Sequence, residues 1–268
     1  MQQHETAVTK TISRLILVFP LPDTPCYFSS YVLALNSEKE MINGIDLNVF
    51  TIQKQSDLDD YIDFIQDASQ VLRPSGILLS MTIHHNYAVF PPYVYELVDR
   101  VNVMTYDMIL GKDPNSGYYN HHASIHMVQN AIQKFVDSGC PRHKIVMGIP
   151  AYSRHQENPG MIKTFAEIVD EATVETATTA VNNVWNGYLY DSPNVVRQKV
   201  MLAMDMDLAG IFFWELGQDK QHDGIAPGGI LLEAAAAASE AAASADSNGR
   251  VNVEHSTKSD TSNTNEEL

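Results

Sequence analysis

The stretch 43–50 reads Asn-Gly-Ile-Asp-Leu-Asn-Val-Phe and places polar side chains where chemistry is possible. Its apolar residues alternate with Asp46, Asn48 and Phe50, and this period of two predicts a strand with two different faces. A carboxylate and an amide on one face of an apolar strand are costly to bury without hydrogen-bond partners. The pair therefore indicates either a functional site or a satisfied polar pair at a strand end, and this stretch alone leaves both interpretations open.

More polar and aromatic residues follow the ends of other apolar runs. They are His84 and His85, Tyr106 and Asp107, Tyr152 and Arg154, and Trp214. Aromatic rings over polar groups suit a sugar, whose C–H face stacks on a ring while its hydroxyls take hydrogen bonds. The alternatives are ordinary ones: a buried tryptophan or tyrosine is more often core, and Arg154 could form a plain surface ion pair.

Apolar runs that alternate with helical patterns must position these side chains. Strands are predicted at 14–19, 44–50, 77–83, 100–106, 144–151 and 208–214. Helices are predicted at 28–42, from an N-cap at Ser56 to Arg73-Pro74, and at 91–98, 122–138, 165–172, 194–204 and 230–243. Strand followed by helix, repeated, predicts an α/β fold with parallel strands, and in such folds the site lies at the carboxyl ends of the strands.

Length and composition fit one domain with polar ends. The chain has 268 residues, 44% of them hydrophobic, and we expect a polar segment at 1–11, a barrel-type domain at 12–243 and a disordered acidic tail at 244–268. The net charge of −16 disfavours nucleic acid and anionic membranes as partners, although simple solubility also explains it. Cys26 and Cys140 exclude a dense disulfide framework and leave one bridge open.

Metal and cofactor sites are not predicted. His84-His85 and His121-His122 are adjacent pairs, and adjacent residues on a strand point to opposite faces, so neither pair chelates one ion easily. The sequence holds no phosphate-binding glycine loop, no Cys-x-x-Cys and no Gly-x-Ser-x-Gly. No run reaches transmembrane length, and we interpret the short run 15–21 as a core strand rather than a signal peptide.

Taken together, these residues resemble the family 18 glycoside hydrolases, which comprise chitinases and chitinase-like lectins. The octapeptide is similar to the family signature Asp-Gly-x-Asp-x-Asp-x-Glu. Four further segments match in order: Asn102–Asp107 resembles Met-x-Tyr-Asp, Gly148–Arg154 resembles Gly-x-Pro-x-Tyr-Gly-Arg, Tyr190–Pro193 resembles Tyr-Asp-(Asp/Ser)-Pro, and Gly210–Trp214 resembles the last strand. The match covers roughly residues 14–233.

The resemblance implies a TIM-type (β/α)8 barrel, in which the six predicted strands would be strands three to eight. No candidate precedes them for the first two strands, so we expect an incomplete barrel with open edges, which a partner chain could cover. The family is usually secreted, whereas this chain shows no export signal, and its location stays open.

The signature departs from the family at the positions that carry catalysis. The resemblance makes residue 50 the general acid, and Phe50 has no proton to donate. The aspartate that orients the acetamido group of the substrate is replaced by Asn48, and only Asp46 is kept. Asp107 and Glu215 are the carboxylates that could substitute, neither of them well placed, so we predict no chitinase activity.

The binding positions are better kept. By the resemblance, Tyr106 would bind an acetamido group, Asp107 a sugar hydroxyl, and Trp214 would form the floor, with Tyr152 and Arg154 on the wall. This favours an inactive chitinase-like protein that binds N-acetylglucosamine-containing glycans, although the Phe50 ring could fill the cleft. Two alternatives remain: a degenerate scaffold acting through protein contacts, and a weakly active hydrolase with a displaced acid.

Overall fold

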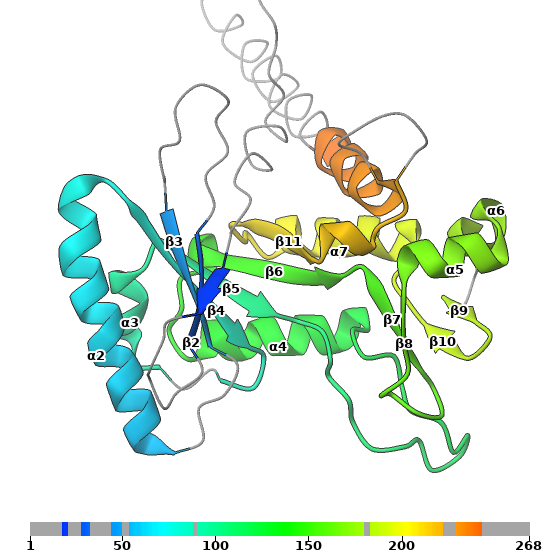
Figure 1. Ribbon diagram of the computed structural model, residues 1–268, viewed down its shortest axis with the longest axis horizontal. Coiled ribbons are helices and arrows are strands. Elements are labelled where there is room, and N and C mark those ends of the chain that lie inside the picture. The colour runs from blue at the N-terminus through cyan, green and yellow to red at the C-terminus, as the bar shows by residue number, and fades with distance from the viewer. Residues whose placement is uncertain are drawn as a thin grey trace, which may run out of the picture.

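The computed structural model describes residues 18–20, 28–32, 44–49, 54–87, 90–179, 183–221 and 229–242. Their main feature is a seven-stranded sheet in the order β1-β2-β3-β4-β5-β6-β11 (Figure 1). The strands are β1 (Val18–Pro20), β2 (Phe28–Val32), β3 (Gly44–Val49), β4 (Leu78–His84), β5 (Arg100–Met104), β6 (Ile145–Pro150) and β11 (Gly210–Trp214).

Strands β3, β4, β5, β6 and β11 pair in parallel, as the alternation of strands and helices predicts. Their carboxyl ends therefore share one rim. On β4, Leu79, Met81 and Ile83 enter the main hydrophobic core, so the alternating Ser80 and Thr82 face the opposite side of the sheet. This second face carries the polar residues of the candidate site.

Amphipathic helices cover the apolar face of the parallel strands. They are α2 (Gln55–Leu72), α3 (Pro92–Leu97), α4 (Ile125–Asp137) and α7 (Pro193–Asp205). Their buried residues, such as Ile65, Val94 and Phe135, join the apolar residues of β4 and β5 in one core. Local sequence fixes the helix starts: Ser124 caps α4 and Ser192 caps α7, where Pro193 occupies the first turn without losing a hydrogen bond.

A second, smaller sheet separates β6 from α7 in the sequence. It is antiparallel, in the order β8-β7-β10-β9, and consists of β7 (Tyr152–His155), β8 (Ile162–Thr164), β9 (Val184–Trp185) and β10 (Tyr188–Leu189). Helices α5 (Phe165–Ala172) and α6 (Val174–Thr179) accompany it at the end of the molecule away from α2 (Figure 1). The sequence patterns predict α5 but not these short strands, and they place the residues of β7 at the end of the strand before it.

The amino-terminal part of the sheet differs from the prediction. Residues 28–32 form strand β2 instead of the start of a helix, and β2 pairs antiparallel with both β1 and β3. The run 14–19 was expected in a parallel sheet, yet the described part of it, within β1, is the outer strand of this antiparallel unit. Phe28, Tyr31 and Val32 are good strand formers, and their strand propensity outweighs the spacing that predicts a helix over 28–42.

Helix starts and ends differ by a few residues. Helix α2 begins at Gln55 after an N-cap at Lys54, not at Ser56, because Asp57 reaches back to the Lys54 amide at 3.2 Å. The last helix covers 230–242, and its first amides, those of Leu231 and Leu232, donate to Asp219. The expected polar segment at 1–11 and the tail at 244–268 lie outside the described residues. Within the described residues, no helix is both long and apolar enough to cross a membrane.

Candidate functional site

The carboxylate of Asp46 lies in a closed polar cradle on β3. It accepts hydrogen bonds from Ser80 Oγ at 2.5 Å, Thr82 Oγ1 at 2.6 Å and Asn102 Nδ2 at 2.9 Å, donors supplied by β4 and β5. Its side chain is buried, and this burial raises the pKa of Asp46 although the three hydrogen bonds oppose the shift. The cradle therefore satisfies both carboxylate oxygens from within the sheet.

Asn48 stands two residues further along β3, on the same face of the strand. It is 2% exposed, and its Oδ1 has no hydrogen-bond partner among the described residues. A buried amide oxygen without a donor is unfavourable by about 1–3 kcal/mol. The Asn48 amide oxygen is thus an acceptor for which the described residues supply no donor.

A second carboxylate, Asp107, lies just past the end of β5 in an ionic cluster. Its Oδ1 is 2.5 Å from Arg154 Nε on β7 and 3.3 Å from His122 Nδ1. Hydrogen bonds from His122, Arg154 and Tyr152, together with the guanidinium charge, outweigh the opposing effect of burial and hold the pKa of Asp107 well below its usual range. Asp107 is thus an ionised acceptor whose side chain keeps 34% of its surface exposed.

Aromatic rings from β7, from β11 and from the loop after β5 pack together beside this cluster. The ring of Tyr106 meets those of Tyr152 and Phe212 edge to face, with centroids 6.2 Å apart in each case. Trp214, at the end of β11, is partly exposed and packs against the hydrophobic cluster that contains Tyr106 and Tyr152. Close approach is possible because β6 has Gly148 here: a Cβ atom at 148 would lie 2.8 Å from both Tyr106 and Phe212.

The structure thus brings together five of the predicted site residues: Tyr106, Asp107, Tyr152, Arg154 and Trp214. Tyr152 and Arg154 belong to the first strand of the second sheet rather than to the end of β6. Phe50, the predicted position of the lost acid, lies outside the described residues. The ligand-binding roles of all these residues remain predictions.

Sequence reasoning missed the partners of both carboxylates. Ser80, Thr82 and Asn102 form the Asp46 cradle, and His122 contacts Asp107. The signal for the first three was present, because Ser80 and Thr82 alternate with apolar residues in the same manner as Asp46 and Asn48. His122, which precedes α4 in a turn, stood out in the sequence only as half of an adjacent histidine pair, and that pair does not point to a contact with Asp107.

Contrary to the prediction, the rings of the two histidine pairs do not point to opposite faces. The rings of His84 and His85 lie 3.9 Å apart by centroid, and those of His121 and His122 stack at 5.3 Å with 7° between planes. Each pair lies at or beyond the end of regular structure, so strand alternation does not govern its side chains. Within the described residues, no group of three or more histidine, cysteine, aspartate or glutamate side chains could hold a metal ion.

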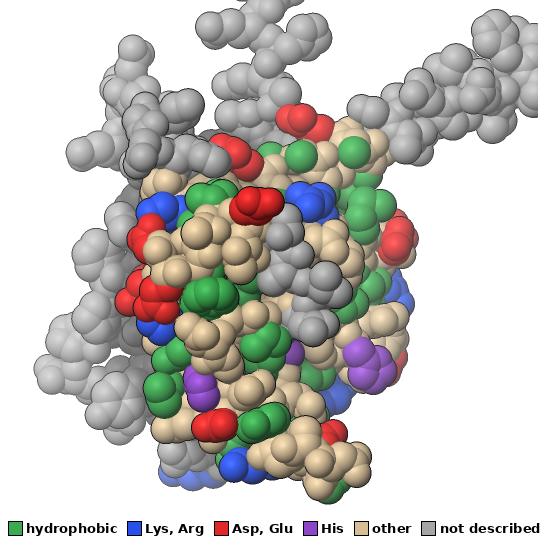
Figure 2. Space-filling view, turned by 90° about the vertical axis from the view of Figure 1, so that its right-hand side faces the viewer, with side chains coloured by type: hydrophobic (Ala, Val, Ile, Leu, Met, Phe, Trp, Pro, Cys, Tyr) green, Lys and Arg blue, Asp and Glu red, His purple; other side chains and the backbone are tan. Residues whose placement is uncertain are grey.

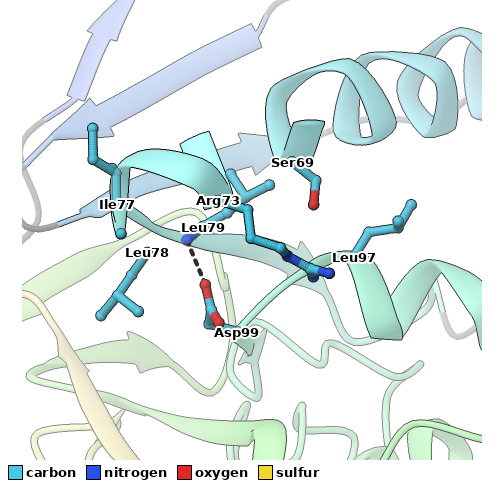
Figure 3. A pocket seen from close by; sticks show the side chains of 8 residues that line it. Ser69, Arg73, Ile77, Leu78, Leu79, Leu97 and Asp99 are labelled. Atoms are coloured by element: carbon cyan, nitrogen blue, oxygen red, sulfur yellow. Dashed lines mark hydrogen bonds between the residues drawn. The ribbon is translucent and has the colours of Figure 1, made fainter. Parts of the chain in front are cut away.

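One cavity lies far from this rim, at the amino-terminal end of β4. Arg73, Leu97 and Asp99 are among its lining residues, and Asp99 accepts a hydrogen bond from the Leu79 amide (Figure 3). The face formed by α5, α6 and the second sheet shows acidic, basic, histidine and apolar side chains interspersed (Figure 2). Neither feature adds a chemical group to the residues that meet at the rim.

The comparisons with known proteins assign the chain to a family. The model of the glycosyl hydrolases family 18 matches residues 10–219, which is more than half of the chain. The protein therefore belongs to the glycosyl hydrolases family 18, as the motifs indicated.

Its curated relatives are distant and longer. It is 26% identical to Endochitinase 1 of Metarhizium robertsii over 158 residues, 47% of this chain and 37% of the relative. It is 24% identical to class V chitinase CHIT5b of Medicago truncatula over 227 residues, 66% of this chain and 59% of the relative. The chain thus spans well under two thirds of these relatives.

Solved structures show the same fold. A plant class V chitinase mutant from Cycas revoluta in complex with (GlcNAc)3 aligns with a TM-score of 0.59 at 21% identity, covering 73% of this chain and 67% of that one. The chitinase ChiB from Flavobacterium johnsoniae aligns with a TM-score of 0.58 at 22% identity, covering 73% and 60%. The chain therefore has the TIM-barrel-type α/β fold of this family, of which the described strands form an open, partial sheet.

Proposed function

We propose that this chitinase-like protein binds N-acetylglucosamine-containing glycans at the rim of Tyr106, Asp107 and Trp214, and does not hydrolyse them. One observation carries the proposal: the groups suited to holding a sugar meet in one place, while the signature position for the proton donor holds Phe50. Relatives of the same family have been solved with GlcNAc oligomers bound.

Asp107 supports the proposal as an acceptor for a sugar hydroxyl. An ionised carboxylate offers about four lone-pair sites, and His122, Arg154 and Tyr152 supply three donors. These contacts fix the carboxylate in position, and its exposed part leaves one site for a ligand hydroxyl. Because the group is already ordered, binding costs little side-chain entropy.

Asn48 supports the same class of ligand. Its buried Oδ1 has no described donor, and an acetamido N–H would supply one. A site that hydrogen-bonds a particular polar group rejects ligands lacking it, since the protein atom is then left unpaired. We therefore expect preference for N-acetylated sugars over their deacetylated counterparts.

The nearest alternative proton donors are poorly suited to acid catalysis. A general acid works best with a pKa near the working pH, whereas Arg154 and His122 hold the pKa of Asp107 far below that range. Glu215 follows Trp214 but its side chain is exposed, away from a low-dielectric pocket. These environments disfavour the alternative of an active hydrolase with a displaced acid.

Binding is tested by titrating tri-N-acetylchitotriose while following tryptophan fluorescence. The chain has two tryptophans, so Trp185→Phe leaves Trp214 as the reporter at the site. We expect a saturable change in this variant and a loss of affinity of at least tenfold in Trp214→Ala, measured by calorimetry. A wild-type protein that gives neither heat nor fluorescence change would contradict the proposal and favour a scaffold that binds no sugar.

Loss of catalysis is tested separately with a chromogenic chitobioside. We expect no product from the wild type above the buffer rate, and a rise in rate when Asn48→Asp and Phe50→Glu are combined, because these changes restore the family signature. Turnover by the wild type faster than by Phe50→Ala would show that another group donates the proton.

A further inference from the structure

His122 makes an unusual set of contacts for a residue outside the sequence motifs. Its ring is 1% exposed, and Nδ1 lies 3.3 Å from Asp107 Oδ1 and 3.3 Å from the backbone nitrogen of Asp107. The peptide oxygen of His122 also accepts from the Met108 amide at 2.9 Å. Two atoms of this residue, Nδ1 and the peptide oxygen, thus make three contacts with Asp107 and the residue after it.

Two aromatic rings contact the His122 ring. It stacks on His121 at 5.3 Å and lies 5.2 Å from the ring of Tyr152. His121 in turn approaches Asp191 at 3.5 Å, and Asp191 pairs with the buried Lys199 of α7. A line of contacts therefore runs from the interior of the protein to the exposed carboxylate of Asp107.

Asp107 needs such support because its backbone is in an uncommon conformation. Its φ is +57°, a left-handed geometry that non-glycine residues adopt only when local contacts favour it. Arg154 approaches the carboxylate from β7, whereas His122 approaches from the turn before α4. Two directions of approach fix the carboxylate more narrowly than one ion pair does.

We propose that His122 is a positioning residue: its Nδ1–H donates to Oδ1 of Asp107 and holds that carboxylate in the orientation that accepts a sugar hydroxyl. A neutral imidazole has one protonated nitrogen, so Nδ1 cannot both donate to the carboxylate and accept from the Asp107 amide. A hydrogen bond to an ionised carboxylate is the stronger of the two. The inference rests on the proposed glycan-binding function, although the tautomer it assigns does not.

The test exploits two amide substitutions that differ in where they place a donor. His122→Asn puts an amide nitrogen near the position of Nδ1, whereas His122→Gln puts one near Nε2. For tri-N-acetylchitotriose we expect His122→Asn to stay within about threefold of the wild-type affinity and His122→Gln to lose about tenfold. His143→Gln, which changes an exposed histidine, is the control and should bind as the wild type does.

A purely structural role would give a different result. Both amide variants remove the stacked ring, so a packing role predicts equal loss of affinity in both, matching equal losses in thermal stability, and this result would overturn the proposal. Nitrogen-15 NMR provides a readout without ligand: we expect Nδ1 of His122 to be protonated and its signal to move in Asp107→Asn. A protonated Nε2 with a bare Nδ1 would also overturn the proposal.

Failure of the two proposals can be told apart. If the wild type binds no chitooligosaccharide but NMR shows that Nδ1 of His122 is protonated and donates to Asp107, the glycan-binding proposal fails and the positioning of Asp107 by His122 stands. If the wild type binds and the two amide variants behave alike, glycan binding stands and the role of His122 is wrong.

Discussion

Asp46 lies on β3 and Asp107 lies just past the end of β5, and their surroundings shift the pKa values of the two carboxylates in opposite directions. Asp46 is enclosed by three uncharged donors, and burial raises its pKa. Asp107 faces a guanidinium and a histidine, keeps a third of its surface exposed, and has a lowered pKa. Residue type alone does not distinguish them.

The two sets of contacts give Asp46 and Asp107 different structural roles. The Asp46 cradle ties β3, β4 and β5 together and leaves its carboxylate no surface for a ligand. The Asp107 cluster joins β5 to the second sheet through Arg154 and presents a charged oxygen outward. Asp46, which the family signature keeps, therefore contributes to the fold, whereas Asp107, which Arg154 contacts from the second sheet, is the carboxylate of the proposed binding site.

The largest expected effect is on the cradle. Asp46→Ala would remove the acceptor of the Ser80 and Thr82 hydroxyls and one of the two acceptors of Asn102 Nδ2, which also donates to Thr82 Oγ1. Each polar group left unsatisfied in the interior costs about 1–3 kcal/mol. We expect the free energy of unfolding in urea to fall by about 3–5 kcal/mol. Asp63→Ala, at an exposed position on α2, should change it by less than about 0.5 kcal/mol. A loss below about 1 kcal/mol for Asp46→Ala would mean that the cradle is not structural.

The next effect concerns the histidines around the Asp107 side. Burial lowers the pKa of His85 and of His121 to about 4 from 6.5. Below pH 6.5 the unfolded chain binds protons that the folded chain does not, so stability is complete above pH 6.5 and falls as the pH drops toward 4. We expect a loss of about 1–3 kcal/mol per histidine over this window.

Urea unfolding at pH 7, 5.5 and 4 measures this loss. His121→Gln should remove about half of this pH dependence, because His85 still contributes, whereas the exposed His143→Gln should leave it unchanged. A stability that stays constant from pH 7 to 4 in the wild type would show that these histidines are not buried uncharged.

A smaller effect should appear in binding. Asp107→Asn keeps the size of the side chain but removes the charge that orders Arg154, and a hydrogen bond to a charged group contributes about 1.5–3 kcal/mol. We expect affinity for tri-N-acetylchitotriose to fall by tenfold or more while stability changes by less than about 1 kcal/mol, since the pair is partly exposed. Asp46→Asn should show the reverse pattern, and equal effects of the two variants would remove the contrast between the two carboxylates.

The smallest expected effect is that of pH on the affinity for the glycan. Because the pKa of Asp107 lies below its ordinary value of 3.8, the carboxylate stays charged throughout the mildly acidic range. Calorimetric affinity of the folded protein should therefore change by less than about twofold between pH 7 and pH 5. A fall in affinity that follows a titration curve between pH 7 and pH 5 would show that another ionising group takes part in binding.

Much of the parallel sheet could be predicted from the sequence, because β4, β5, β6 and β11 lie in mainly apolar runs with clear ends. Shorter elements could not, because the strands of the second sheet have two to four residues each and show no measurable periodicity. The rim residues Tyr106, Asp107 and Trp214 were found because each follows a strand. The cradle of Asp46 and the contact of His122 depend on pairing between distant segments, which a single sequence does not display.

Gly148 has a consequence for how this site can change. It lies on β6 between Tyr106 and Phe212, where a Cβ atom would come within 2.8 Å of each ring. The rings of Tyr106 and Phe212 can therefore lie this close to β6 only because residue 148 has no Cβ atom. An alanine at 148 would displace the rings that shape the site without touching a bound sugar, so ligand preference could evolve from within the sheet.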